Sequence, residues 1–289
     1  MFSSLGDADP FDRHHRLVCS PLYSARQLAI QRLIIVVYGG ATLVTSLVYE
    51  SVVLRQGNIW FSYFTHLTYI GLFSYFLASA YHGFNYKPVP SSSYAHPLQR
   101  WHRGLQVMHM LLLSTVTTFP LLVTICYWAL IASPATFSSP YETWSAISLH
   151  ILNTVFVLFE IFTTNIPPLP WITLPVCLVL LLSYLGVAYI TFASQGVYTY
   201  AFLDPKTQHS KLAAYIVGIA VGHIIIFVLV RYAIVLRDKI SKFARYHEED
   251  TQHQGPKEAL NEWEEVEWED AGQRESAGSS VGRSTSEVK

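Results

Sequence analysis

Long apolar runs separated by short polar stretches make up most of the chain between residues 28 and 236. A helix that crosses a bilayer needs about 20 consecutive, mostly apolar residues. Several prolines fall between the runs, where helices stop, among them Pro88, Pro90, Pro97, Pro134, Pro140, Pro167, Pro168 and Pro170. The runs that reach the required length cover residues 28–53, 60–83, 107–131, 144–165, 171–193 and 212–236. This pattern predicts an all-α integral membrane protein built as a six-transmembrane-helix bundle.

The basic residues of the connecting segments predict the orientation of the bundle, because cytosolic segments carry an excess of Lys and Arg. An even number of spans places both termini on the same side of the membrane. That side holds 12 Lys and Arg residues, and the opposite side holds 3. We therefore expect both termini in the cytosol and the loops 54–59, 132–143 and 194–211 in the lumen or outside the cell.

The charges are distributed unevenly along the 289 residues, of which only 13% are charged. A soluble domain has about 25% charged residues. Residues 1–245 hold 15 Lys and Arg against 8 Asp and Glu, whereas residues 246–289 hold 4 against 12. We expect a cytosolic segment at 1–27, a transmembrane domain at 28–245 and a disordered acidic cytosolic tail at 246–289.

Composition also limits the kinds of site and partner that we expect. The 3 cysteines lack the spacing of a disulfide framework or a zinc site, and the chain has no glycine-rich phosphate loop. No metal, cofactor or nucleic-acid partner is expected. The tail block that contains Trp263 and Trp268 would either dock on a basic cytosolic protein or remain solvated.

Ionisable residues inside the predicted spans are costly, and they therefore mark candidate functional positions. These residues are His66, His82, His109, His150, Glu160 and His223. The histidines can stay neutral in the membrane. Glu160 is expected to be protonated or paired, because desolvation disfavours the carboxylate.

Thr65 and His150 are predicted at similar depth in two of the spans. Their helices enter from the same side at Trp60 and Trp144, which we expect at the headgroup level. Each residue then lies roughly 7–9 Å along its helix axis, at about 1.5 Å per residue. A threonine hydroxyl becomes a nucleophile when a neighbouring base, such as a neutral histidine, takes its proton. The two residues are a candidate nucleophile and base.

Three segments resemble the family of androgen-induced and androgen-dependent regulator proteins, which are small multi-pass membrane proteins. Residues 60–68 (WFSYFTHLT) are similar to the start of the family's second helix. Residues 149–160 (LHILNTVFVLFE) resemble its histidine-containing helix, with a glutamate ten residues after the histidine. Residues 196–204 (GVYTYAFLD) resemble its Gly-x-x-x-Tyr-Pro-Phe-Leu-Glu stretch after the fifth helix.

Characterised members of this family are threonine hydrolases that cleave fatty acid esters of hydroxy fatty acids. The resemblance implies that Thr65 is the nucleophile, that His150 is the base and that a membrane lipid is the substrate. It also implies an endomembrane location, such as the endoplasmic reticulum, or the plasma membrane. The residues expected to contribute to substrate binding are Asn153, Glu160, Tyr200 and Asp204.

Two interpretations without hydrolysis remain open, so the sequence does not decide whether the chain is an enzyme. Asn153, three residues after His150, fits the rolling-stone branch of the wider superfamily. A member of that branch would be a non-catalytic membrane protein acting in fusion, adhesion or scaffolding. The several histidines in the spans also allow a transporter or a haem redox protein in which His66 pairs with His150.

Overall fold

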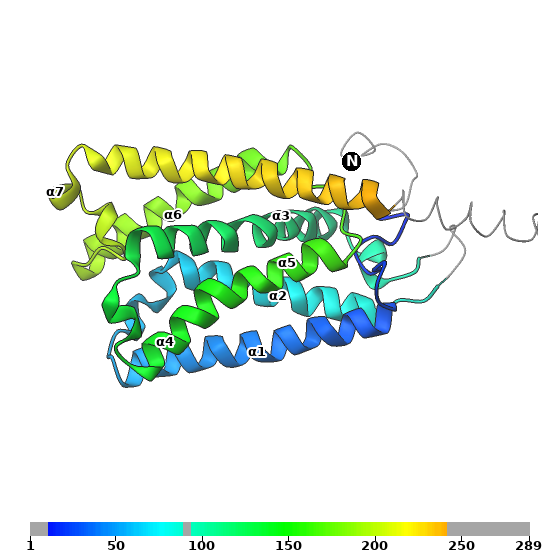
Figure 1. The fold of residues 1–289 in the computed structure, drawn as a ribbon, viewed down its shortest axis with the longest axis horizontal. Coiled ribbons are helices and arrows are strands. Elements are labelled where there is room, and N and C mark those ends of the chain that lie inside the picture. Colours follow the sequence, from blue (N-terminus) through cyan, green and yellow to red (C-terminus); the bar gives the residue numbers. More distant parts are fainter. Residues whose placement is uncertain (1–10, 89–93, 242–289) are drawn as a thin grey trace, which may run out of the picture. The chain divides into compact units, whose positions relative to one another are not determined.

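The computed structural model describes residues 11–88 and 94–241, and every regular element within them is helical (Figure 1). The chain divides into a compact unit, Met1–Arg237, and a second unit, Asp238–Lys289. Only residues 238–241 of the second unit are described, as the last turn of a helix. The predicted acidic tail at 246–289 and the first ten residues of the predicted N-terminal segment lie outside the described residues.

Five of the described helices are long and apolar enough to cross a membrane. They are Ala25–Val52 (α1), Arg103–Ile131, Pro140–Thr163, Thr173–Gln195 (α6) and Lys211–Ser241. Their bounds lie within a few residues of five of the six predicted spans. The described chain therefore has the helices of a multi-pass membrane protein, as the apolar pattern predicts.

The remaining predicted span, 60–83, is helical but is not among the five candidate membrane-crossing helices. It consists of the 3-10 turn Gly57–Ser62 (η1) and the 21-residue helix Phe64–Phe84 (α2). Helix α2 packs against α1 and against α3 (Arg103–Cys126), and it buries polar side chains, among them Ser79 and His82. A helix that is covered by other helices can carry polar residues that lipid would not accept.

Two of the long helices are interrupted by π-helical turns, which are rare and occur frequently at functional sites. Helix α3 (Arg103–Cys126) continues into the π turn Tyr127–Ile131 (η3). The fourth long helix consists of α4 (Pro140–Ile147), the π turn Ser148–Leu152 (η5) and α5 (Asn153–Thr163). Four further short elements are η2 (Pro97–Arg100), η4 (Pro134–Phe137), η6 (Ala201–Leu203) and α7 (Pro205–Gln208).

Local sequence explains where several of these helices begin and end. Ser24 caps α1 through a capping box with Gln27, which satisfies backbone N–H groups that have no acceptor inside the helix. Helix α6 ends where Gly196 adopts a φ of 74°, a left-handed conformation that glycine accepts without a steric penalty. Pro205 starts α7 at a position where a missing N–H costs nothing.

The connections of the bundle gather at its two ends (Figure 1). The connections that follow α1, α3 and α6 lie at the end where α2 begins, and there the side chains of Asn58 and Gln195 are hydrogen-bonded. We name this the Thr65 end. At the opposite end, Arg16 holds the N-terminal segment by donating from Nε to Asn165 O at 2.8 Å. The predicted loops therefore group at two ends as expected.

The interior of the bundle is tightly packed around α2. Leu72, Tyr75 and Phe76 of α2 and Leu113 of α3 have no exposed surface. Lipid tails are as apolar as these side chains, so helix association in a membrane depends on close packing and interhelical polar contacts. A buried polar group that contacts another helix is therefore expected to stabilise the bundle.

Candidate functional site

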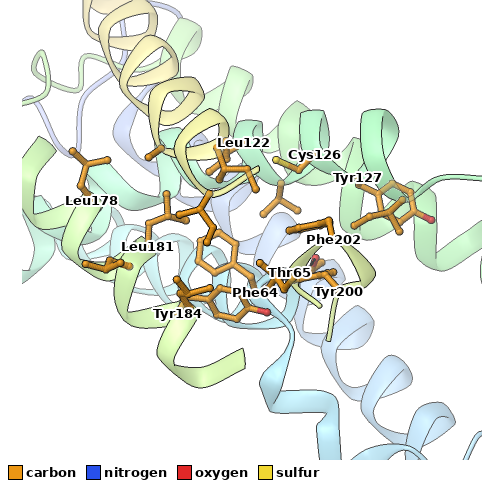
Figure 2. Close-up of a pocket in the computed structure, with 18 residues that line it drawn as sticks. Phe64, Thr65, Leu122, Cys126, Tyr127, Leu178, Leu181, Tyr184, Tyr200 and Phe202 are labelled. Atoms are coloured by element: carbon orange, nitrogen blue, oxygen red, sulfur yellow. Dashed lines mark hydrogen bonds between the residues drawn. The ribbon is translucent and has the colours of Figure 1, made fainter. Parts of the chain in front are cut away.

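An apolar cavity of about 320 Å³ lies at the Thr65 end of the bundle (Figure 2). The start of α2, the end of α3, the middle of α6, residues 200–203 and residues 216–220 of the last helix form its wall. Most of the lining side chains are Leu, Ile, Val or Phe. The lining side chains with polar groups are Thr65, Cys126, Tyr127, Tyr184 and Tyr200. We name this space the Thr65 cavity.

Thr65 lies in the first turn of α2 and is 8% exposed. Its Oγ1 lies 3.4 Å from the hydroxyl of Tyr200, and its backbone N–H donates to the same hydroxyl oxygen at 3.4 Å. The N–H groups of a first helical turn have no acceptor inside the helix and face a region of positive potential. Thr65 therefore lines an apolar space at the N-terminal end of a helix, and its hydroxyl lies beside the hydroxyl of Tyr200.

Tyr200 comes from the loop between α6 and α7 and is held by aromatic neighbours. Its ring is parallel to that of Phe202 at 5.2 Å between centroids and meets Tyr63 edge to face at 5.8 Å. Burial raises the pKa of the Tyr200 phenol, so the hydroxyl keeps its proton at neutral pH. Figure 2 shows Tyr200 next to Thr65 at the cavity wall.

His150 lies one aromatic ring away from the cavity. Its imidazole stacks on the ring of Tyr127, with centroids 3.6 Å apart and an interplanar angle of 4°. Tyr127 itself lines the cavity. Both residues lie in π turns, η3 and η5, which bring them together from two different helices. The Nδ1 atom of His150 is buried and has no hydrogen-bond partner among the described residues.

Thr65 and His150 are thus both found at the Thr65 end, but they are not hydrogen-bonded to each other. The hydroxyl of Thr65 bonds to Tyr200, and Tyr127 occupies the space between His150 and the cavity. In this arrangement a proton passes between them only through an intervening group or after a rearrangement. Hydrogen bonds of catalytic groups are often longer in sites without substrate.

Two of the predicted substrate-binding residues make local structural contacts instead of lining the cavity. Asn153 Oδ1 accepts from Thr124 Oγ1 at 3.1 Å, and this contact joins α5 to α3. Asp204 caps α7, because its Oδ1 accepts from the backbone N–H of Lys206 at 2.9 Å. Tyr200 is the predicted binding residue that does line the cavity.

Glu160 lies apart from the cavity in a buried network that we name the Glu160 network: Arg32, Tyr75 and Glu160. Arg32 Nη2 is ion-paired with Glu160 Oε1, and Arg32 Nε donates to Glu160 Oε2 at 3.2 Å. Tyr75 OH donates to Glu160 Oε1 at 2.7 Å, and Arg32 Nη1 donates to Leu17 O at 3.0 Å. Of the two expectations for this buried carboxylate, the structure shows the paired one.

His66 and Trp60 form a second buried arrangement at the Thr65 end. The His66 ring stacks on Trp60 at 4.2 Å, and its Nδ1 lies 2.7 Å from Trp60 O. His66 Nε2 lies 3.6 Å from Glu50 Oε1. Trp60 is only 2% exposed, and its indole N–H donates to Ser46 Oγ at 3.3 Å inside the bundle.

Among the lining residues that the sequence did not single out are the aromatic residues Phe64, Tyr127 and Tyr184. Aromatic residues within apolar runs are more often packing residues, and a π turn has no recognisable sequence pattern. Across the described part of the chain, no group of three or more His, Cys, Asp or Glu side chains is placed to hold a metal ion.

Comparisons with protein-family models, with curated proteins and with solved structures give no match for this chain.

Proposed function

We propose that the protein is an intramembrane hydrolase of lipid esters, in which Thr65 is the nucleophile and His150 the base. The observation that carries the proposal is the position of the Thr65 hydroxyl in the wall of a large apolar cavity, beside the hydroxyl of Tyr200. An apolar cavity with a few placed polar groups is the usual form of a small-molecule site. The resemblance of three segments to the androgen-induced family points to the same chemistry.

The reaction proceeds in two halves. Thr65 Oγ1 attacks the ester carbonyl carbon while His150 takes the hydroxyl proton, through a bridging water or after a shift of Tyr127. The carbon–oxygen bond of the ester then breaks, and the departing alkoxide of the hydroxy fatty acid takes the proton. Water attacks the acyl-threonine, which restores the Thr65 hydroxyl and releases the second acid.

The donors for the tetrahedral oxyanion are the Tyr200 hydroxyl and the N-terminus of α2. Both lie at Thr65, since the Tyr200 oxygen is 3.4 Å from Thr65 N and from Thr65 Oγ1. Donors that are fixed in an apolar space stabilise developing charge far better than donors in water. This assignment gives Tyr200 a catalytic role in addition to its place in the cavity wall.

The membrane arrangement belongs to the same proposal. Helix α2, which packs against its neighbours, completes the six spans together with the five long apolar helices. Both termini are cytosolic. The Thr65 end then faces the lumen or the exterior of an endomembrane or the plasma membrane. The substrate is a membrane lipid that reaches the cavity laterally, so that its apolar chains never cross water.

The test is hydrolysis of a fatty acid ester of a hydroxy fatty acid by the purified full chain in detergent or vesicles. We expect Thr65→Ala and His150→Gln to lower kcat by about 10³-fold or more. Thr42→Ala and His223→Gln are the matched controls, because both residues are buried but line neither the Thr65 cavity nor the site around it. Full activity of folded Thr65→Ala would contradict the proposal, and so would equal losses in the controls.

A further inference from the structure

A second apolar cavity of about 300 Å³ lies beside the Thr65 cavity, between α2, α3 and α6. We name it the Gly71 cavity. Its wall includes Leu67, Gly71, Val116, Phe119 and Leu180. The proposed chemistry does not use this space.

The two cavities share a wall made of the same two rings. Phe64 and Tyr184 line both cavities, and their ring centroids lie 4.8 Å apart. Phe64 also meets Phe119 edge to face at 5.3 Å on the side of the Gly71 cavity. Phe64 directly precedes Thr65 on α2, so the partition between the cavities stands next to the proposed nucleophile (Figure 2).

The hydroxyl groups in the wall of the Gly71 cavity do not make it polar. Thr68 Oγ1 donates to Thr65 O at 3.0 Å, Thr115 Oγ1 to Leu112 O at 2.9 Å, and Ser183 Oγ to Val179 O at 2.8 Å. Each of these hydroxyls therefore bonds to a carbonyl of its own helix. Hydrocarbon is the ligand chemistry that such a wall accepts without leaving a polar group unpaired.

We infer that the Gly71 cavity holds the second hydrocarbon chain of the ester, and that Phe64 separates the two chains at the scissile bond. This inference rests on the proposed function. One chain lies in the Thr65 cavity and the other lies in the Gly71 cavity, with the ester carbonyl at Thr65. Filling either cavity must then penalise a different chain of the substrate.

Two cavity-filling variants and a matched control test this arrangement. Gly71→Leu fills the Gly71 cavity, and a Cβ there meets Leu112 Cδ1 at an ordinary 3.9 Å. Ala220→Leu fills the Thr65 cavity. Gly186→Leu makes the same glycine-to-leucine change on α6 at a position that lines neither cavity and has no atom within 4 Å of an added Cβ.

The readout is kcat/KM for two ester series, one in which only the acid chain varies in length and one in which only the hydroxy-acid chain varies. We expect Gly71→Leu to lower the preference for long chains about tenfold in one series, and Ala220→Leu to do so in the other series. Gly186→Leu is expected to change neither. Effects of both filling variants on the same series, or an unchanged preference in Gly71→Leu, would overturn the inference.

Ser183→Leu is the second variant for the case in which Gly71→Leu does not fold. Ser183 is exposed and also lines the Gly71 cavity, and its hydroxyl bonds only to its own helix. We expect Ser183→Leu to lower the preference for long chains in the same ester series as Gly71→Leu. A shift in the other series would overturn the inference.

Photo-crosslinking separates this inference from the proposed function. The probes are two non-hydrolysable ether analogues of the ester that carry a diazirine at the end of one chain or the other. We expect the two labels on different walls, one around Gly71 on α2 and α3 and one around residues 216–220 of the last helix. Separate labels without hydrolysis would support binding of the two chains in two cavities but would contradict the proposed hydrolase function. Hydrolysis with both labels in one cavity would support the hydrolase function but would overturn the inference that the Gly71 cavity holds the second chain.

Discussion

The Glu160 network and the Thr65 site are both buried polar groups inside the same bundle, yet they are built in opposite ways. Both oxygens of Glu160 have donors, and Arg32 Nη1 donates to the backbone carbonyl of Leu17. The Thr65 site has a cavity beside it, a long contact of 3.4 Å from Thr65 to Tyr200 and an unpartnered Nδ1 on His150.

This difference separates a structural polar group from a candidate catalytic one. A buried charge that is fully paired has no capacity left for a ligand, and its loss is felt in stability. A buried polar atom without a partner costs stability and calls for an explanation such as a bound ligand or a catalytic role. Burial and ionisable character alone therefore did not distinguish Glu160 from His150. The unpartnered Nδ1 of His150 does so only together with the cavity nearby, because both ring nitrogens of His82 and His223 are also buried without a partner among the described residues.

The largest expected effect on stability belongs to Glu160. Glu160→Gln leaves the Arg32 charge buried without its counter-ion, so we expect a loss of about 3–5 kcal/mol in the free energy of unfolding. Glu142→Gln on exposed Glu142, which lies in the first turn of α4 and accepts from the hydroxyls of Ser138 and Ser139, is the control, with a change of about 1 kcal/mol or less. Unfolding in detergent micelles measures both.

The double variant Arg32→Met/Glu160→Met tests whether the unpaired Arg32 charge causes the stability loss, because it removes both charges together. We expect it to recover most of the stability lost in Glu160→Gln. Hydrolysis per folded molecule should stay unchanged in both variants. A loss of kcat in folded Glu160→Gln would mean that the network takes part in the chemistry.

The next largest effect is expected on catalysis at the Thr65 site. Tyr200→Phe removes one oxyanion donor but keeps the ring that packs on Phe202, so we expect kcat to fall about 10²-fold, roughly 2.7 kcal/mol. The midpoint of thermal unfolding should move little. Tyr198→Phe in the same loop, at a residue that does not line the cavity, is the control. A Tyr200→Phe variant with full kcat would leave Tyr200 as a packing residue.

The smallest effect concerns Asp204, which the resemblance placed at the substrate and the structure places at a helix cap. Asp204→Ala removes the acceptor for Lys206 N, so we expect a stability loss of about 1 kcal/mol. KM and kcat should both be close to those of the unmodified protein. A large rise in KM would restore Asp204 to the substrate site.

The long apolar helices could be predicted from sequence because their length is set by the thickness of the bilayer. Thr65 was singled out by its predicted depth and by family resemblance, and Tyr200 by resemblance alone; the structure places both in one cavity wall. The stacking of His150 on Tyr127 could not be foreseen, since it depends on two π turns that have no sequence pattern. Asn153 and Asp204 have side chains suited to ligand binding, but tertiary neighbours give them interhelical and capping contacts.

The most direct test of the account is covalent capture of the nucleophile. The purified full chain is treated with a fluorophosphonate that carries a long alkyl chain, and the modified residue is located by peptide mass spectrometry. Attack by Thr65 Oγ1 on phosphorus expels fluoride, so the account predicts an adduct on Thr65 that disappears in Thr65→Ala and is suppressed by excess lipid ester. A preparation that hydrolyses the ester and carries its adduct on another residue, or none on Thr65, would contradict it.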